Sequence, residues 1–261
     1  MKKNFEKIMM LLIVVIMFSS CASLTHMRVK FSSTETKKID KMALISTYLN
    51  IRLPVVPLLD AAIMNETTNS ISDGINLLFK DNIDIMRDSV ARLLQNTLKC
   101  NVIFGEALHG MPGFKEVKEK YNFEDAMANG YKNFPKIISA KDDFNPFKFE
   151  KGNVQKYFKD PNNYMTTISK ICEGLNLNYI AVSLSEIAPA PGSLMSSSTL
   201  FLATYLYLFD KKGNCIASGS NFLTPIKFKA SEVDGYQQSI DTFSATLRPI
   251  IKKIGTKYGN Y

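Results

Sequence analysis

A pair of apolar runs that meet near residue 210 limits the possible folds more than any other feature of this sequence. Thr199–Phe209 reads TLFLATYLYLF, a composition typical of a β-strand. The next residues, DKKGN, predict a hairpin turn in which Gly213 supplies a positive φ, and Cys215–Phe222 returns as the partner strand. Because TLFLATYLYLF is apolar on both faces, a core strand explains it better than a pore strand, which would alternate apolar and polar residues.

Shorter patterns predict the other strands and helices. Apolar residues recur at steps of three and four in three segments, which we interpret as helices: about Ser70–Leu98, Tyr164–Leu175 and Glu232–Lys257. Runs of aliphatic and β-branched residues predict three further strands: Met42–Leu53, Val102–Phe104 and Tyr179–Ile187. Pro249 lies inside the last helix and is expected to kink or split it, because proline lacks the backbone donor.

The stretch Gly105–Asn163 has weaker periodicity than its flanks and many turn-forming residues. We interpret it as an insertion that carries a helix or two, covers one end of the sheet and is a candidate partner surface. Its aromatic residues could bind a glycan or a protein, or form the insertion's own core, which we favour; they are Phe144, Phe147, Phe149, Tyr157 and Phe158. The order of elements predicts a single α+β domain over residues 42–261, with a central mixed sheet of about five strands and helices packed mainly on one side.

Met1–Ser20 has the composition of a secretory signal. Three lysines precede an apolar run from Ile8 to Phe18, which is shorter than the roughly 20 residues that span a bilayer. Phe18-Ser19-Ser20-Cys21 follows and resembles the bacterial lipobox, with Phe where Leu is usual. The resemblance implies cleavage between Ser20 and Cys21 and a diacylglycerol, with a further acyl chain in many bacteria, on Cys21. The alternative is an ordinary signal cut nearby or an uncleaved anchor.

Residues 21–41 are the expected link between the lipid and the domain. Ala22–Lys41 is polar and mixed, which indicates a tether that lifts the folded part off the membrane; the alternative is an edge strand around Met27–Phe31. Ala22 follows Cys21, whereas an Asp at this second position retains some lipoproteins at the inner membrane. By that resemblance we expect the outer membrane, and the leaflet is left open.

The mature chain is moderately basic. Removing three lysines and one glutamate with Met1–Ser20 lowers the formal charge from +8 to +6. A basic surface could meet anionic lipid headgroups, peptidoglycan or acidic partners. A chain rich in Lys, Asn and Ile can also be basic through composition alone, and we favour that explanation. Export and the lack of a basic recognition motif argue against nucleic acid as a partner.

The sequence offers little nucleophilic chemistry. His109, with Glu106 nearby and a distant Ser or Cys, could imitate a catalytic triad, but no GxSxG-like setting accompanies it. Cys100, Cys172 and Cys215 match neither a CxxC nor a zinc spacing. We predict Cys172 to be a buried structural thiol, and any one pair of the three could form a disulfide.

Carboxylates are also poor candidates for a site. Asp84 and Asp88 share a helical face, but Arg87 and other basic residues lie close by, so we predict a solvated, salt-bridged face. Asp142 and Asp143 lack the spacing of a calcium loop. We therefore predict no catalytic, cofactor-binding or metal-binding residue and no enzymatic activity.

Four segments carry a resemblance to a group of envelope proteins: MALISTYLNI, DSVARLLQNTLKCNVIF, ISKICEGLNLNYIAVSLSEI and LFLATYLYLFDKKGNCIASGSNF. In this order behind a lipobox, they are similar to the lipoprotein domains of the curli-secretion CsgG type, the penicillin-binding-protein activator LpoB and the N-terminal domain of TolB. The similarity lies in the order of elements and implies an α+β domain. The long Gly105–Asn163 stretch departs from that pattern, and no segment matches the pore-forming hairpins of the secretion channel.

The lipobox and the resemblance lead to one leading hypothesis and two alternatives. The leading hypothesis is a membrane-anchored, non-enzymatic binding or assembly module of an envelope protein complex, in contact with the bilayer through acylated Cys21 and with an envelope protein. The first alternative is a subunit of an oligomeric outer-membrane secretion channel. The second is a hydrolase that uses His109. The sequence leaves the oligomeric state open.

Overall fold

The computed structural model describes residues 27–32, 37–51, 80, 82–122, 138–146, 164–189, 198–228 and 233–260. Met1–Ser20 and Cys21 lie outside the described residues, so the signal and the lipid anchor stay predictions. Residues 70–79, the first part of the long predicted helix, lie outside them as well.

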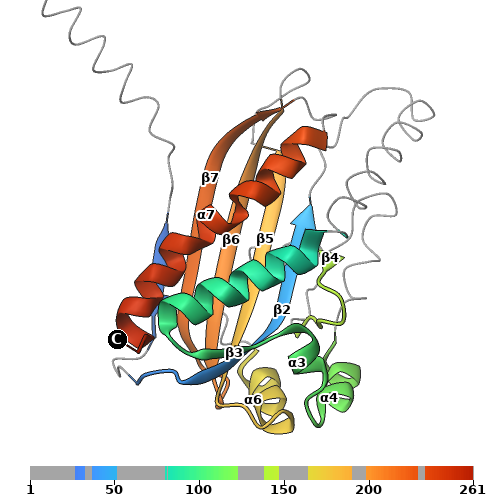
Figure 1. The fold of residues 1–261 in the computed structure, drawn as a ribbon, viewed down its shortest axis with the longest axis vertical. Coiled ribbons are helices and arrows are strands. Elements are labelled where there is room, and N and C mark those ends of the chain that lie inside the picture. The colour runs from blue at the N-terminus through green and yellow to red at the C-terminus, as the bar shows by residue number, and fades with distance from the viewer. Residues whose placement is uncertain are drawn as a thin grey trace, which may run out of the picture.

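A mixed sheet forms the centre of the structure (Figure 1). Among the described residues it has seven strands in the order β1-β7-β6-β5-β2-β3, and β4 pairs with β2 near the end of β2 that is remote from β3. β2 runs parallel to β3 and β5, and the other pairs are antiparallel. The strands are β1 (Arg28–Phe31), β2 (Lys41–Ile51), β3 (Asn101–Ile103), β4 (Ile138–Ser139), β5 (Tyr179–Pro189), β6 (Ser198–Asp210) and β7 (Cys215–Phe228).

β6 is the core strand that its sequence predicts. Leucine side chains lie on one face and aromatic side chains on the other, and both sets are buried: Leu202, Leu206 and Leu208, then Tyr205, Tyr207 and Phe209. The turn to β7 is the predicted hairpin, with Gly213 at φ +82°. A Cβ on Gly213 would lie 1.9 Å from the carbonyl oxygen of Met165, so glycine also allows this turn to touch the next helix layer.

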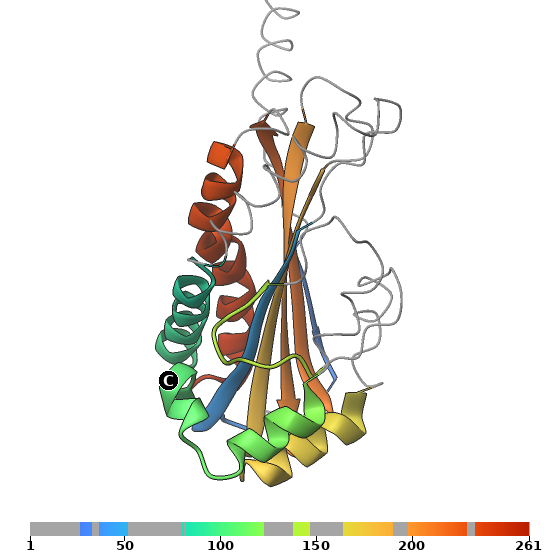
Figure 2. The same ribbon diagram turned by 90° about the vertical axis from the view of Figure 1, so that its right-hand side faces the viewer.

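Two long helices cover one face of the sheet, and three short helices gather at one end of it (Figure 2). The long pair is α7 (Val233–Tyr258) and the helix of residues 82–98, which pack on a cluster that includes Leu44 and Leu206. The short helices are α3 (Gly105–His109), α4 (Phe114–Tyr121) and α6 (Met165–Gly174). They pack on the opposite cluster, which includes Ile45 and Val182. Each face of the central strands is therefore apolar.

The predicted α+β class with a central mixed sheet is confirmed. The strand count exceeds the expected five because two short strands, β1 and β4, join the sheet. β1 pairs antiparallel with β7, so the edge strand considered around Met27–Phe31 is present. The boundary expected at residue 41 is therefore too late, because Arg28–Phe31 already belongs to the domain.

The structure also bears on three finer points: the insertion, Pro249 and the presence of membrane-spanning helices. The insertion does carry two helices, α3 and α4, and it also supplies β4 to the sheet. Of the kink or split expected at Pro249, the split does not occur, because α7 continues from Val233 to Tyr258. Ala245, whose carbonyl group Pro249 cannot bond, is exposed, so water can satisfy that group. In the part of the chain that is described, no helix is both long and apolar enough to cross a bilayer.

Candidate functional site

Asp143 is the centre of a buried charge cluster behind α3. Its side chain is fully buried, and one carboxylate oxygen accepts a hydrogen bond of 3.1 Å from the backbone N–H of Thr47 on β2. The other oxygen lies 3.6 Å from Nε2 of His109 and 3.8 Å from Nη1 of Arg87. At these distances the two contacts are electrostatic and are not full hydrogen bonds. One carboxyl group thus connects β2, α3 and the helix of residues 82–98.

Arg87 fills the space between that carboxyl group and the helix surface. Its guanidinium lies 3.2 Å from carboxylate oxygens of both Asp84 and Asp88, and it donates a hydrogen bond of 3.3 Å to the carbonyl of Lys141. Gly105 makes room for it, because a Cβ there would lie 3.3 Å from the guanidinium. The prediction of a solvated, salt-bridged face is confirmed for Asp84 and Asp88, whose side chains are exposed, but not for the arginine between them. Arg87 is only 9% exposed.

Burial is the main influence on the pKa of Asp143. Removal from water raises the pKa of its carboxyl group above the ordinary value, because a low-dielectric site disfavours the charged form. Contacts with His109, Arg87 and the Thr47 N–H act in the opposite direction and offset part of this rise. Because the Asp143 carboxyl group contacts β2, α3 and the helix of residues 82–98, it is suited to fixing the positions of these three segments.

His109 contacts Asp143 rather than Glu106 and does not complete a triad. Its side chain is 20% exposed and packs against the ring of Phe114 at 5.0 Å. Within the described residues no Ser or Cys donates a hydrogen bond to its imidazole, and Nε2 has no hydrogen-bond partner. The His–Asp contact resembles two members of a triad, but a nucleophile beside them is not found there.

The three cysteines are buried and free, so the pairing left open by the sequence is not formed. Burial raises the pKa of the Cys100 thiol to about 11 and that of Cys172 to about 12. Thiols of this kind are poor nucleophiles. The predicted role of Cys172 as a buried structural thiol agrees with its place among the apolar residues under α6. No group of three or more His, Cys, Asp or Glu in the described ranges is arranged to hold a metal ion.

The aromatic cluster of the insertion is described only at Phe144. Phe144 is fully buried and packs edge-on against Phe114 at 5.8 Å, so this residue belongs to the domain core. Phe147, Phe149, Tyr157 and Phe158 lie outside the described residues.

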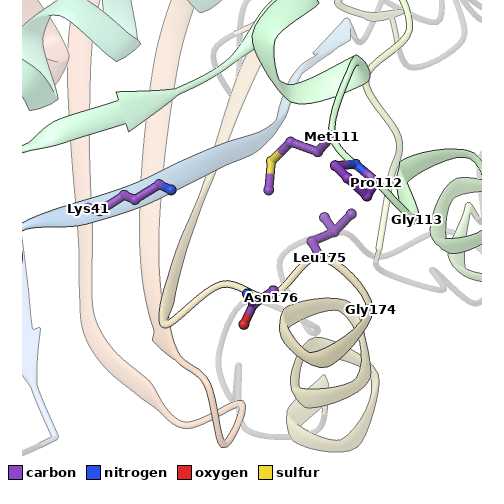
Figure 3. A pocket seen from close by; sticks show the side chains of 7 residues that line it. All are labelled: Lys41, Met111, Pro112, Gly113, Gly174, Leu175 and Asn176. Carbon is purple, nitrogen blue, oxygen red and sulfur yellow. The ribbon is translucent and has the colours of Figure 1, made fainter.

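A pocket of about 390 Å³ opens where the α3–α4 connection meets the end of α6 (Figure 3). Met111, Pro112 and Leu175 lie together in it, and the side chains of Lys41 and Asn176 lie to one side of them. The pocket therefore combines an apolar floor with a cation at its edge. Sequence reasoning missed it, because its walls come from segments that are far apart in the chain.

Two glycines shape this pocket. Gly113, at φ +80°, approaches α6 so closely that a Cβ would lie 2.5 Å from the carbonyl oxygen of Gly174. A Cβ on Gly174 would in turn lie 2.5 Å from a methyl group of Val117. The backbones of the α3–α4 connection and α6 are therefore in direct contact, and larger residues at either position would separate them.

The fold and this corner define the chain as an α+β domain with a buried charge cluster and an adjacent open pocket. No family model matches the chain, and no curated protein sequence is similar to it. The solved structures that are similar include PelC and a single-substitution form of PelC, both dodecamers from Paraburkholderia phytofirmans. Each is 10% identical with a TM-score of 0.32; they cover 87% and 88% of this chain and 97% and 99% of their own. At this TM-score the likeness carries no argument about fold or function.

Proposed function

We propose that this protein is a membrane-anchored envelope lipoprotein that acts as a non-enzymatic binding or assembly module for an envelope protein complex. The observation that carries the proposal is the order of a charged N-terminus, an apolar run, two serines and Cys21. Acylation of that cysteine places the mature chain at a membrane surface, where two or more acyl chains anchor a protein stably.

The start of the folded domain supports this proposal. β1 begins at Arg28, and only a few residues separate it from Cys21. Six peptide units from Cys21 to Met27 span about 20 Å at full extension. A lipid on Cys21 would therefore hold the sheet close to the bilayer rather than at the end of a long tether.

The pocket supports the binding part of the proposal. Interfaces draw most of their affinity from a few apolar anchors that fill pockets in the partner. Met111, Pro112 and Leu175 supply such a pocket, and Lys41 supplies a cation for a neighbouring carboxylate. We assign the envelope protein partner to this corner, which includes the α3–α4 part of the insertion expected to carry a partner surface.

The test is capture of envelope proteins by the lipidated, tagged protein and two methionine variants. Met111→Glu places a charge in the pocket, and Met165→Glu is the matched control because Met165 is 43% exposed on α6. We expect the wild type and Met165→Glu to capture the same proteins and Met111→Glu to lose them. Deletion of residues 105–163 is unsuitable, because it removes the buried Leu108, Phe114 and Phe144. Identical capture by all three proteins, or no specific capture by the wild type, would contradict the proposal.

Lipidation has its own test. Cys21→Ala should leave the precursor uncut or release the protein from the membrane fraction, because the acylated thiol is lost. Intact mass of the wild-type protein should show loss of Met1–Ser20 and the added acyl chains. Unchanged fractionation and mass in Cys21→Ala would exclude the anchor.

The contact of His109 with Asp143 is the one observation that favours a hydrolase instead. A hydrolase predicts turnover by the wild type and its loss in His109→Gln, with folding unchanged by circular dichroism. We expect no turnover of ester, peptide or glycan substrates by either protein. Activity that depends on His109 would replace the binding proposal with an enzymatic one.

A further inference from the structure

One edge of the molecule collects basic side chains beside the start of the folded chain. We define the β1–α7 edge as the exposed side of β1, the 37–40 connection and the second half of α7 (Figure 1). Its basic residues are Arg28, Lys30, Lys37, Lys38, Arg248, Lys252, Lys253 and Lys257. No Asp or Glu occurs from Thr242 to Asn260, and Asp40 is the acidic residue among the described part of the connection.

Contacts between its segments make this edge a continuous surface. Nζ of Lys257 lies 4.9 Å from the ring centroid of Phe31 on β1, and the ring of Phe31 lies 5.9 Å from that of Tyr258. The backbone N–H of Ile39 donates to the carbonyl of Tyr258, and Lys38 donates to the carbonyl of Gly259. Val29 and Phe31 face α7, because both pack against the cluster that includes Ile250, and a Cβ on Gly219, the partner of Val29, would touch Ile250. Arg28 and Lys30 therefore point to the opposite face of β1, so the basic side chains line both sides of this edge.

On α4, on α6 and in the β6–β7 turn, cations are interleaved with carboxylates. On α4, Glu116 and Glu119 alternate with lysines, and on α6 Glu173 follows Lys170. In the β6–β7 turn, Asp210 precedes Lys211 and Lys212. Composition alone is the explanation that we favour for the net charge of the chain, but it does not explain a basic edge that lacks such carboxylates.

The β1–α7 edge is also the part of the domain that the proposed anchor holds nearest to lipid. β1 begins within about 25 Å of Cys21 even when the intervening residues are fully extended. The exposed side chain of Met27, 37% exposed, precedes Arg28 and adds an apolar contact at this point. Basic residues close to a bilayer are attracted to anionic headgroups within roughly a Debye length, about 8 Å at physiological ionic strength.

We propose that the β1–α7 edge docks on the anionic phosphate headgroups of the bilayer that holds the acylated Cys21. This inference rests on the proposed lipid anchor. Docking turns the basic flank of α7 and β1 toward lipid, while the pocket corner at Met111 lies elsewhere and stays available to a protein partner. The acyl chains supply attachment, and the lysines supply orientation.

The test uses the mature lipidated chain in vesicles and measures lysine acylation by a water-soluble amine reagent, read by mass spectrometry. Vesicles are phosphatidylcholine alone or phosphatidylcholine with phosphatidylglycerol. We expect Lys30, Lys252 and Lys253 to be protected only with phosphatidylglycerol, while Lys115, Lys170 and Lys211 react equally in both. High salt should remove the protection, because it screens the headgroup charge.

A pair of charge variants tests the cause of the protection. Lys252→Gln/Lys253→Gln removes two cations from the edge, and Lys211→Gln/Lys212→Gln removes two from the β6–β7 turn as the matched control. Since each lysine favours an anionic surface by roughly fivefold, the edge variant should restore most of the labelling of Lys30. The control variant should leave Lys30 protected.

Each other outcome overturns the inference. Equal labelling of both lysine groups, on a protein whose mass carries the acyl chains, excludes docking and leaves the anchor standing. Protection in neutral vesicles excludes headgroup charge as its cause. Protection by a soluble acidic polysaccharide but not by vesicles assigns the edge to a glycan instead. A mature protein without acyl mass overturns the anchor itself and, with it, this inference.

Discussion

At Asp143, one carboxyl group contacts residues from three parts of the chain. Asp143 accepts a hydrogen bond from the Thr47 N–H, which holds the loop after β4 against β2. Its contacts with Arg87 and His109 connect the same loop to the helix of residues 82–98 and to α3. Arg87 also contacts Asp84 and Asp88, so its charge keeps partners when Asp143 is neutral. We therefore expect the hydrogen bond, rather than the charge of Asp143, to make the larger stabilising contribution.

Substitutions at Asp143 separate these two contributions. Asp143→Asn keeps an acceptor for the Thr47 N–H, and we expect the free energy of unfolding at neutral pH to change by less than about 1 kcal/mol. Asp143→Ala leaves that buried N–H without its acceptor and should cost about 1–3 kcal/mol. Urea unfolding followed by circular dichroism measures both. Asp142→Asn, on the exposed neighbour, is the control and should match the wild type. Equal losses in Asn and Ala would assign the stability to the charge instead.

The raised pKa of Asp143 also predicts a pH dependence. Because the native state keeps this proton to higher pH than the unfolded chain, the native state binds more protons in that window, and stability falls as pH rises. From about pH 4, the ordinary pKa of Asp, the wild type should lose stability relative to Asp143→Asn until the native carboxyl group has ionised. A wild type that instead gains stability relative to Asp143→Asn would show that Arg87 and His109 outweigh burial.

At the scale of elements, long periodic segments were predictable and short or non-local ones were not. Eight or more residues of repeated pattern define β6, α6 and α7, and each begins and ends close to its predicted bounds. β1 and β4 have four and two residues, which is too short for a pattern to distinguish them from loops. The contact of Asp143 with Thr47 joins positions 96 residues apart, so no local spacing indicates it. The burial of Arg87 likewise depends on Gly105, which only the tertiary fold brings near.

The docking of α7 on β7 depends on Gly219. Gly219 has no side chain, which leaves room for Ile250, because a Cβ at Gly219 would lie 2.1 Å from Cγ2 of Ile250. Gly219→Ala should therefore destabilise the domain by about 1–3 kcal/mol through overpacking. Ile250→Ala should cost about 2–5 kcal/mol through the cavity it leaves. In the double variant the new methyl group occupies part of that cavity, so the loss should be smaller than the sum of the single losses. Urea unfolding of all four proteins measures the coupling, and strict additivity would show that the two side chains do not meet.

At the scale of the whole molecule, the strand order explains how an N-terminal anchor could orient a domain. β1 is an edge strand that pairs with β7, and β7 carries α7 on one face, so the first described strand lies at the β1–α7 edge. The pocket lies at the α3–α4 corner near the far side of the sheet, where β2 and β3 lie. An anchor at one edge and a partner pocket toward the other are compatible with simultaneous contact to lipid and protein.

The length of the link between Cys21 and Arg28 should then decide how strongly the domain is oriented. Inserting about 20 Gly and Ser residues after Ser23 adds a flexible chain with an end-to-end distance of roughly 25 Å, enough for the domain to turn freely. The effective concentration of the basic edge at the bilayer falls with linker length, so protection of Lys30, Lys252 and Lys253 should weaken in anionic vesicles. Membrane fractionation should stay unchanged, because the acylated cysteine is retained. An inserted rigid helix of Glu, Ala and Lys should abolish the protection by lifting the edge beyond the Debye length. Protection that is the same for all three links would mean that the lysines are shielded by something other than the bilayer surface.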